Sequence, residues 1–87
     1  MKIKEGLIIR EVAGSYIVVA VGNAVKDFNG IINLNETGAF LWKTLEKGAT
    51  EEEMLQAMLS EYDVDEETAR KDLKSFINKL QEAKLLK

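Results

Sequence analysis

The sequence predicts an α+β fold in which a three-stranded antiparallel sheet precedes three helices. Short β-branched segments fill the first third of the 87-residue chain, whereas apolar residues at helical spacing and helix start signals fill the rest. The two parts meet at Asn29–Leu45, where a short apolar run leads directly into an amphipathic segment. The length suffices for one modest core, so we expect a single domain spanning residues 1–87.

The composition excludes several classes of function. A net charge of −3 gives no long-range attraction to nucleic acid or to an anionic membrane. The chain has no Cys and no His, which removes disulfides, thiolate nucleophiles, imidazole bases and the usual transition-metal ligands. No signal peptide follows Met1, and the longest apolar run, residues 17–21, is too short to span a bilayer. We therefore expect a cytoplasmic protein that needs no cofactor.

Two β-branched segments predict a β-hairpin near the N-terminus. They span Leu7–Val12 and Tyr16–Val21, with Gly14-Ser15 between them. Glycine at the first central position of a two-residue loop is typical of a type II′ turn. The second segment is apolar on both alternating faces, as in a central strand or one covered on both sides.

A third strand is expected at Gly30–Leu34, after a looser connection over residues 22–26 and a turn over residues 27–30. As the last strand of a meander it would be an edge, with backbone N–H and C=O groups free to pair. Residues 31–33 carry none of the Lys, Pro or charged side chains that usually protect such an edge. Two interpretations stay open: the edge pairs with an incoming peptide, or a tail or a second copy of the chain covers it.

Start and stop signals predict three helices. Asn35 is a good N-cap for a helix over Glu36–Lys47, and Gly48 ends it. Thr50 and Glu53 form a capping box for a second helix that runs to about Glu61. Asp65-Glu66-Glu67 marks the start of the third. The predicted core residues are Leu41, Trp42, Leu45, Met54, Leu55, Met58, Leu59, Ala69, Leu73, Phe76, Ile77 and Leu80, with Leu85-Leu86 packing back onto them.

No catalytic constellation emerges. The acidic clusters at residues 51–53 and 65–67 lie at predicted helix starts, where carboxylates are stabilising, and Ser60 and Ser75 have no histidine to activate them. The third helix carries a basic row, Arg70, Lys71 and Lys74, for which a solvated face is the simplest interpretation. If this row lies beside the third strand, the two would flank a groove suited to an extended peptide with apolar anchors and some acidic residues.

One stretch resembles a known family. Leu34-Asn35-Glu36-Thr37-Gly38-Ala39, followed by Leu41-Trp42, resembles the "LNxxGxxIW" joint of the PqqD family, whose members are also described as RiPP recognition elements. The individual motifs are short and mostly structural, but their order and spacing are together fairly specific. The resemblance reaches back to Arg10-Glu11 and the hairpin, and onward through Gly48, Thr50, Tyr62-Asp63-Val64-Asp65, Asp72, Phe76 and Leu80 to Leu85-Leu86.

The resemblance implies a winged helix-turn-helix-like fold and a non-catalytic peptide chaperone. Such proteins bind the leader of a ribosomally made precursor peptide as a strand added to the third strand, and present it to a modifying enzyme, in many members a radical SAM protein. Nothing in the sequence identifies the pyrroloquinoline quinone pathway itself. Leu34, Asn35, Trp42 and Phe76 are assigned mainly to folding. The implied peptide contacts are Gly30, Ile31, Ile32, Asn33 and Leu34 on the strand, and Arg70, Lys71, Lys74 and Ile77 on the third helix.

Three other functions compete with this one. A winged-helix DNA-binding regulator is the main alternative, although acidic neighbours such as Asp72 interrupt the cations of the third helix, so no nucleic acid is expected. A carrier protein with a modified serine fits poorly, because Ser75 lies inside a helix. A module that oligomerises through its free edge is the third, and either a monomer or a homodimer is compatible with the sequence.

Overall fold

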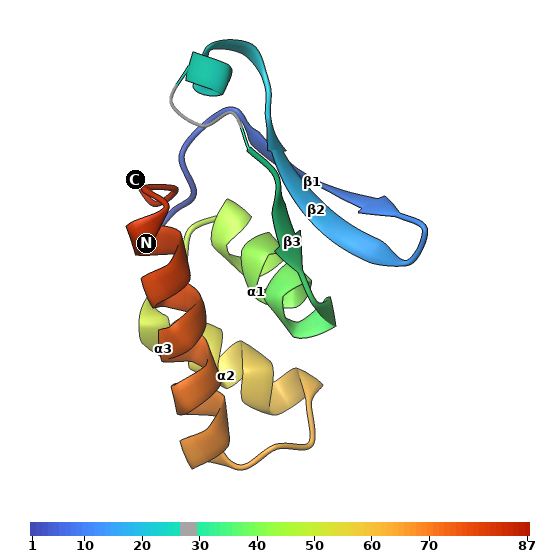
Figure 1. Cartoon of the computed structure of the whole chain (residues 1–87). Coiled ribbons are helices and arrows are strands. Elements are labelled where there is room, and N and C mark those ends of the chain that lie inside the picture. The colour runs from blue at the N-terminus through green and yellow to red at the C-terminus, as the bar shows by residue number, and fades with distance from the viewer. Residues whose placement is uncertain (27–29) are drawn as a thin grey trace.

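The computed structural model describes residues 1–26 and 30–87, and it confirms three antiparallel strands followed by three helices (Figure 1). Part of the predicted turn, residues 27–29, lies outside the described residues. Residues 22–26 form a short 3-10 helix rather than a loose connection, and the third strand begins at residue 32 instead of 30. The elements are β1 (Leu7–Val12), β2 (Ser15–Ala20), η1 (Gly22–Lys26), β3 (Ile32–Leu34), α1 (Glu36–Glu46), α2 (Glu51–Glu61) and α3 (Glu66–Glu82).

The sheet has the order β1-β2-β3, so β2 is the central strand, as its two apolar faces predicted. The hairpin turn differs from the prediction by one residue. Val12 pairs with Ser15, so Ala13 and Gly14 are the central residues, with φ of 51° and 82°. Two positive φ angles define a type I′ turn rather than type II′. Gly14 therefore stands at the second central position of the turn. Ala13, at the first central position, adopts the left-handed conformation.

Polar caps fix where the helices begin. The Asn35 side chain accepts a hydrogen bond from the Gly38 amide at 2.7 Å, so α1 starts directly after β3 with no loop between them. Thr50 and Glu53 form the predicted capping box, with bonds of 2.8 and 3.1 Å. Asp65 accepts from the Thr68 amide at 3.2 Å at the start of α3. Local polar residues thus set the order of elements.

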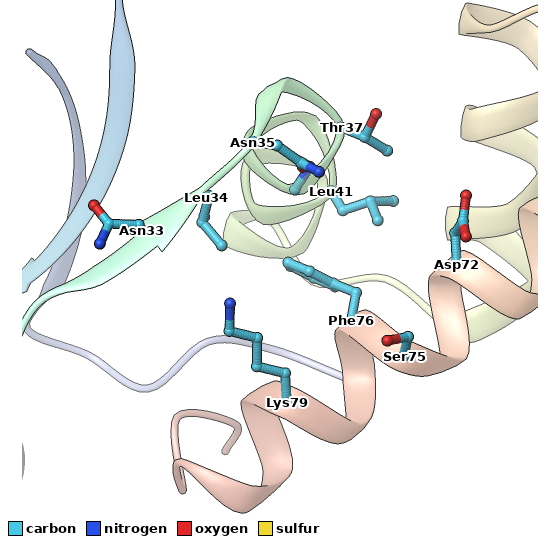
Figure 2. A pocket seen from close by; sticks show the side chains of 10 residues that line it. Asn33, Leu34, Asn35, Thr37, Leu41, Asp72, Ser75, Phe76 and Lys79 are labelled. Atoms are coloured by element: carbon cyan, nitrogen blue, oxygen red, sulfur yellow. The ribbon is translucent and has the colours of Figure 1, made fainter.

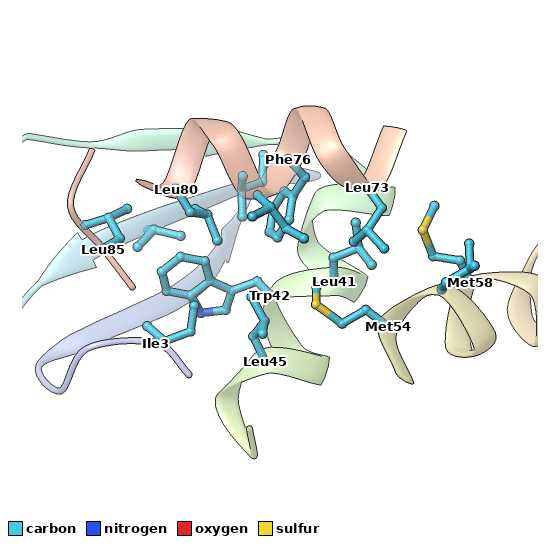
Figure 3. Packing of buried hydrophobic residues seen from close by; sticks show 14 of the residues in the cluster. Ile3, Leu41, Trp42, Leu45, Met54, Met58, Leu73, Phe76, Leu80 and Leu85 are labelled. Atoms are coloured by element: carbon cyan, nitrogen blue, oxygen red, sulfur yellow. The ribbon is translucent and has the colours of Figure 1, made fainter. Parts of the chain in front are cut away.

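One hydrophobic cluster joins the sheet to all three helices (Figure 3). Trp42 is fully buried in it, and its Nε1 has no hydrogen-bond partner among the described residues. Ile3 near the N-terminus and Leu85 near the C-terminus close the cluster, as Leu85 was expected to do, whereas Leu86 and Leu59 are only half-buried. The fully buried large side chains are Trp42, Leu41, Leu45, Met54, Leu55, Met58, Leu73, Leu80, Leu85 and Val18.

The two termini lie side by side at the C-terminal end of α3 (Figure 1). The Lys4 amide donates to the Leu85 carbonyl at 2.9 Å, and the Lys87 amide donates to the Lys2 carbonyl at 2.8 Å. Residue 1 also pairs with Ala49, between α1 and α2, through hydrogen bonds in both directions. These bonds hold the chain ends against the helices, away from β3.

Candidate functional site

The free edge of β3 is the first part of the candidate site. The register shows which backbone groups point out of the sheet. Because Val12 and Ser15 flank a two-residue turn, they form a hydrogen-bonded pair, and alternation then directs the backbone groups of Ser15, Ile17 and Val19 toward β1. The bond from the Val21 amide to the Gly6 carbonyl, 2.7 Å, continues the same alternation.

The opposite set on β2, Tyr16 and Val18, must therefore bond to β3, where it pairs with Leu34 and Ile32. The N–H and C=O groups of Asn33, between those two residues, then point outward from the sheet. Ile31 lies just before the strand and is 62% exposed, and continued alternation would turn its backbone groups outward as well. The edge thus offers a donor and an acceptor to an extended chain, and residues 31–33 themselves carry no charged side chain.

A groove of about 410 Å³ opens between β3, the start of α1, and α3 (Figure 2). Leu34, Leu41 and Phe76 form its apolar floor, and all three are buried. Asn33 borders the groove from β3, and its side chain points to the opposite side of the strand from that of Leu34 (Figure 2). The lining residues are Asn33, Leu34, Asn35, Thr37, Gly38, Leu41, Asp72, Ser75, Phe76 and Lys79.

Three exposed polar side chains of α3 stand beside this floor. Asp72, Ser75 and Lys79 occupy spacings of three and four residues, so they share one side of the helix with Phe76. Asp72 lies toward Thr37 and Leu41, and Lys79 lies at the other end, toward Leu34 (Figure 2). A segment that lay along β3 would therefore meet an apolar centre and two opposite charges.

The helix residues predicted from the sequence are not in this groove. Ile77 is buried, with 6% of its surface exposed, and packs in the core. Arg70 forms ion pairs with Glu52 at 3.6 Å and Glu66 at 3.3 Å. Lys71 and Lys74 are exposed, but neither lines the groove. The pairing of Arg70 with two carboxylates also makes this flank a poor match for the phosphates of DNA.

The helix residues predicted from the sequence differ from those that line the groove for a physical reason. The apolar stripe of α3 has a polar flank on each side, and the sequence-based choice took the flank with more cations. The fold brings the other flank, with Asp72, Ser75 and Lys79, to β3. Phe76 is the available signal in the sequence, because it lies at the edge of the stripe on that side, although the sequence analysis assigns it mainly to folding.

Two carboxylates at helix starts, both outside the groove, have shifted pKa values. The Thr50 amide, followed by the Thr50 side chain, lowers the pKa of Glu53 from its ordinary 4.5. The Thr68 side chain and then its amide lower the pKa of Asp65 from its ordinary 3.8. Both carboxylates are helix caps, which is the role predicted for the two acidic clusters.

Among the described residues, no helix is long and apolar enough to cross a membrane. Residues 1–26 and 30–87 contain no group of three or more His, Cys, Asp or Glu side chains placed to hold a metal ion.

Two solved structures share this fold. TbiB1 in complex with the TbiA(beta) leader peptide is 26% identical, with a TM-score of 0.79; the match covers the whole of this chain and 95% of TbiB1. Lasso peptide synthetase B1 complexed with the leader peptide is 20% identical, with a TM-score of 0.71, over 93% of this chain and 89% of that one. No curated protein sequence matches significantly.

The family comparison matches residues 9–86 to coenzyme PQQ synthesis protein D (PqqD). This match contains β1 from its third residue onward, all of β2, the β3–α1 joint and all three helices. It therefore includes every residue that lines the groove. The chain belongs to the PqqD family.

Proposed function

We propose that this protein is a non-catalytic partner in peptide modification, which binds the leader of a ribosomally made precursor peptide as a strand added to β3. The free edge of β3, open directly beside the groove, is the observation that carries the proposal. The leader then makes the sheet four-stranded, and its side chains on the inner face enter the groove above Leu34, Leu41 and Phe76. The core of the precursor stays outside, available to an enzyme.

The two structural relatives support this assignment. TbiB1 and lasso peptide synthetase B1 were both solved with a leader peptide, and TbiB1 is the more similar of the two. The resemblance to PqqD proteins also suggests the type of enzyme served, a radical SAM protein of the cytoplasm. The chemistry of that enzyme is not encoded in the groove, so another modifying enzyme fits the same binding mode.

Strand addition separates affinity from specificity. The outward backbone groups of Asn33 and Ile31 pair with any extended chain, whereas the groove contacts only alternate side chains of that chain. Ordering a disordered leader costs on the order of 2–5 kcal/mol, so a micromolar affinity is expected rather than a tighter one. The functional gain is effective concentration, because a held leader keeps the core close to the enzyme.

The proposed contacts combine predicted and newly located residues. Gly30–Leu34 stays as predicted, with backbone pairing through Ile31 and Asn33 and with Leu34 on the groove floor. On α3, the proposed contacts are Asp72, Ser75, Phe76 and Lys79, in place of Arg70, Lys71, Lys74 and Ile77.

A proline on each edge of the sheet tests strand addition. Asn33→Pro removes the outward donor of β3, and edge strands tolerate proline where the N–H faces solvent. Glu11→Pro is the matched control, since alternation also points the Glu11 amide outward, on the free edge of β1. We expect Asn33→Pro to weaken binding of the leader encoded beside this protein at least tenfold in calorimetry. Glu11→Pro should leave it unchanged.

Circular dichroism must first show that both variants keep the folded state. Equal affinity of the two folded variants would contradict strand addition at β3. Loss of binding in Glu11→Pro alone would move the site to the β1 edge. A variant that fails to fold is replaced by N-methylation of the peptide backbone, which removes the same hydrogen bonds from the side of the ligand.

A further inference from the structure

Two side chains of opposite charge line the groove, one near each end. Among its ten lining residues, Asp72 and Lys79 are the two that are charged. Neither side chain has an ion-pair or hydrogen-bond partner among the residues that the structure describes. Arg70 on the far flank, in contrast, is held by Glu52 and Glu66. The groove therefore presents one anion and one cation that are free to meet a ligand.

These two charges lie at opposite ends of the apolar floor. Seven residues of helix separate them, which corresponds to about 10.5 Å along the axis of α3. Figure 2 shows Lys79 beside Leu34 and Asp72 beyond Leu41, with Phe76 between them. β3 and α3 thus run in opposite directions past the groove.

An added strand can match this spacing, because three of its side chains can face Asp72, the apolar floor and Lys79 in turn. Residues of a strand point to the same face at every second position, and two such steps span about 13 Å. A residue opposite Leu34 lies over the floor, and its neighbours two positions before and after lie near the two charges. The difference from 10.5 Å is within the reach of flexible Lys and Glu side chains.

The direction of the strand fixes which charge comes first. Antiparallel pairing continues the sheet as it stands and is somewhat more stable per residue than parallel pairing. A strand antiparallel to β3 runs from the Asp72 end of the groove to the Lys79 end.

We infer that the groove selects a leader segment of the order cation, any residue, large aliphatic residue, any residue, carboxylate, read from N- to C-terminus. The cation faces Asp72, the aliphatic side chain fills the floor over Leu34 and Phe76, and the carboxylate faces Lys79. This inference rests on the proposed function, and it adds the sequence class of the peptide. It also gives a reason for the opposite charges on one flank of α3.

Two synthetic peptides of identical composition test the order. Acetyl-TSKTLTEST-amide has the inferred order, and acetyl-TSETLTKST-amide has the charges exchanged. In NMR titrations of the labelled protein, we expect the first to bind about tenfold more tightly than the second, the scale for two exposed ion pairs turned from attraction to repulsion. The preference should shrink as salt is raised.

A double variant with the two groove charges exchanged should reverse the preference between the two peptides. In Asp72→Lys with Lys79→Glu, acetyl-TSETLTKST-amide should become the tighter ligand, whereas Lys74→Glu, a charge change outside the groove, should keep the wild-type preference. Because the side chains of Asp72, Lys74 and Lys79 are all exposed, these substitutions leave the core intact.

Equal affinity of the two peptides for the wild type, with shifts at β3 and α3, would overturn the charge order and leave strand binding in place. Shifts elsewhere, or none from either peptide, would overturn the order as well. Strand addition itself is tested by a different measurement, the loss of binding of the natural leader in Asn33→Pro. A wrong charge order can therefore be distinguished from a wrong proposed function.

Discussion

Single hydrogen-bonded carboxylates mark the starts of two helices. Glu53 accepts from the Thr50 amide at 2.8 Å, and Asp65 accepts from the Thr68 amide at 3.2 Å. The Thr50 amide and then its side chain favour the ionised Glu53, and the Thr68 side chain and then its amide favour the ionised Asp65, which is why both pKa values lie below their ordinary 4.5 and 3.8. Since the unfolded chain lacks these bonds, each carboxylate couples the stability of its helix to pH.

The sign of this coupling gives the first prediction. Because the folded-state pKa values are depressed, the contribution is fully present above the ordinary values of 4.5 and 3.8, and it is lost as the pH falls through the lower folded values. We expect the free energy of unfolding, from urea denaturation, to fall less steeply below about pH 4.5 in Glu53→Gln with Asp65→Asn than in the wild type. Parallel curves for the two proteins would contradict this role of the caps.

At the groove, Asn35 connects fold and site. Its side chain holds the Gly38 amide at 2.7 Å, and both residues line the groove. A Cβ added to Gly38 would lie 3.2 Å from Asn35 Oδ1 and 3.4 Å from Leu34. The joint between β3 and α1 is therefore tightly packed, and a change in its cap reaches the floor of the groove.

Replacement of this cap is the second prediction. Asn35→Ala should lower the free energy of unfolding by about 1 kcal/mol, whereas Asn35→Asp, which caps equally well, should lower it by a few tenths at most. Thermal unfolding followed by circular dichroism measures both. A loss of the same size in Asn35→Asp would show that the amide NH₂, rather than the capping oxygen, is what matters.

At the scale of elements, the ends of helices and strands could be predicted and their rotation could not. Caps, stop signals and β-branched runs act over three or four residues, and they predicted both ends of α1 and α2 and the start of α3 to within one residue. The hairpin turn moved by one residue because Ala13-Gly14 and Gly14-Ser15 are both plausible central pairs.

The face that α3 turns toward β3 depends instead on how the whole stripe of Ala69, Leu73, Phe76, Ile77 and Leu80 packs against α1 and α2. No local signal encodes this rotation. The sequence therefore predicted the strand that borders the groove, whereas the residues of α3 that line the groove could be identified only in the structure.

The end of α1 gives the third prediction, at this same scale. Gly48 follows the helix with φ of 85°, a conformation that costs other residues about 1–2 kcal/mol. Gly48→Ala should lower the free energy of unfolding by about that amount, measured in urea. Gly22→Ala is a useful comparison, because Gly22 also has a positive φ, 61°, but lies in the short 3-10 helix. No loss in Gly48→Ala would contradict its role as a helix stop.

In the whole molecule, the chain ends pair with each other at the C-terminal end of α3 and close the core there (Figure 1), whereas among the described residues β3 pairs with β2 alone. Ile3 and Leu85 are buried beside Trp42 in this closure (Figure 3).

Leu85→Ala should lower the free energy of unfolding by about 2–5 kcal/mol, the range for a buried leucine. Unfolding can be followed by the loss of the fluorescence of Trp42, the single tryptophan. The half-buried Leu86 is the matched control, and Leu86→Ala should cost clearly less. Equal costs would contradict the packing of Leu85 in the core.

Backbone amide hydrogen exchange with and without the natural leader tests the central claim most directly. In the free protein, the amides of Ile32 and Leu34 bond to β2, whereas that of Asn33 points outward. We expect saturating leader to slow exchange at Asn33 and Ile31 and to leave the outward amides of β1, such as Glu11, unchanged. Leader binding without added protection at Asn33, or with new protection along β1, would contradict strand addition at β3.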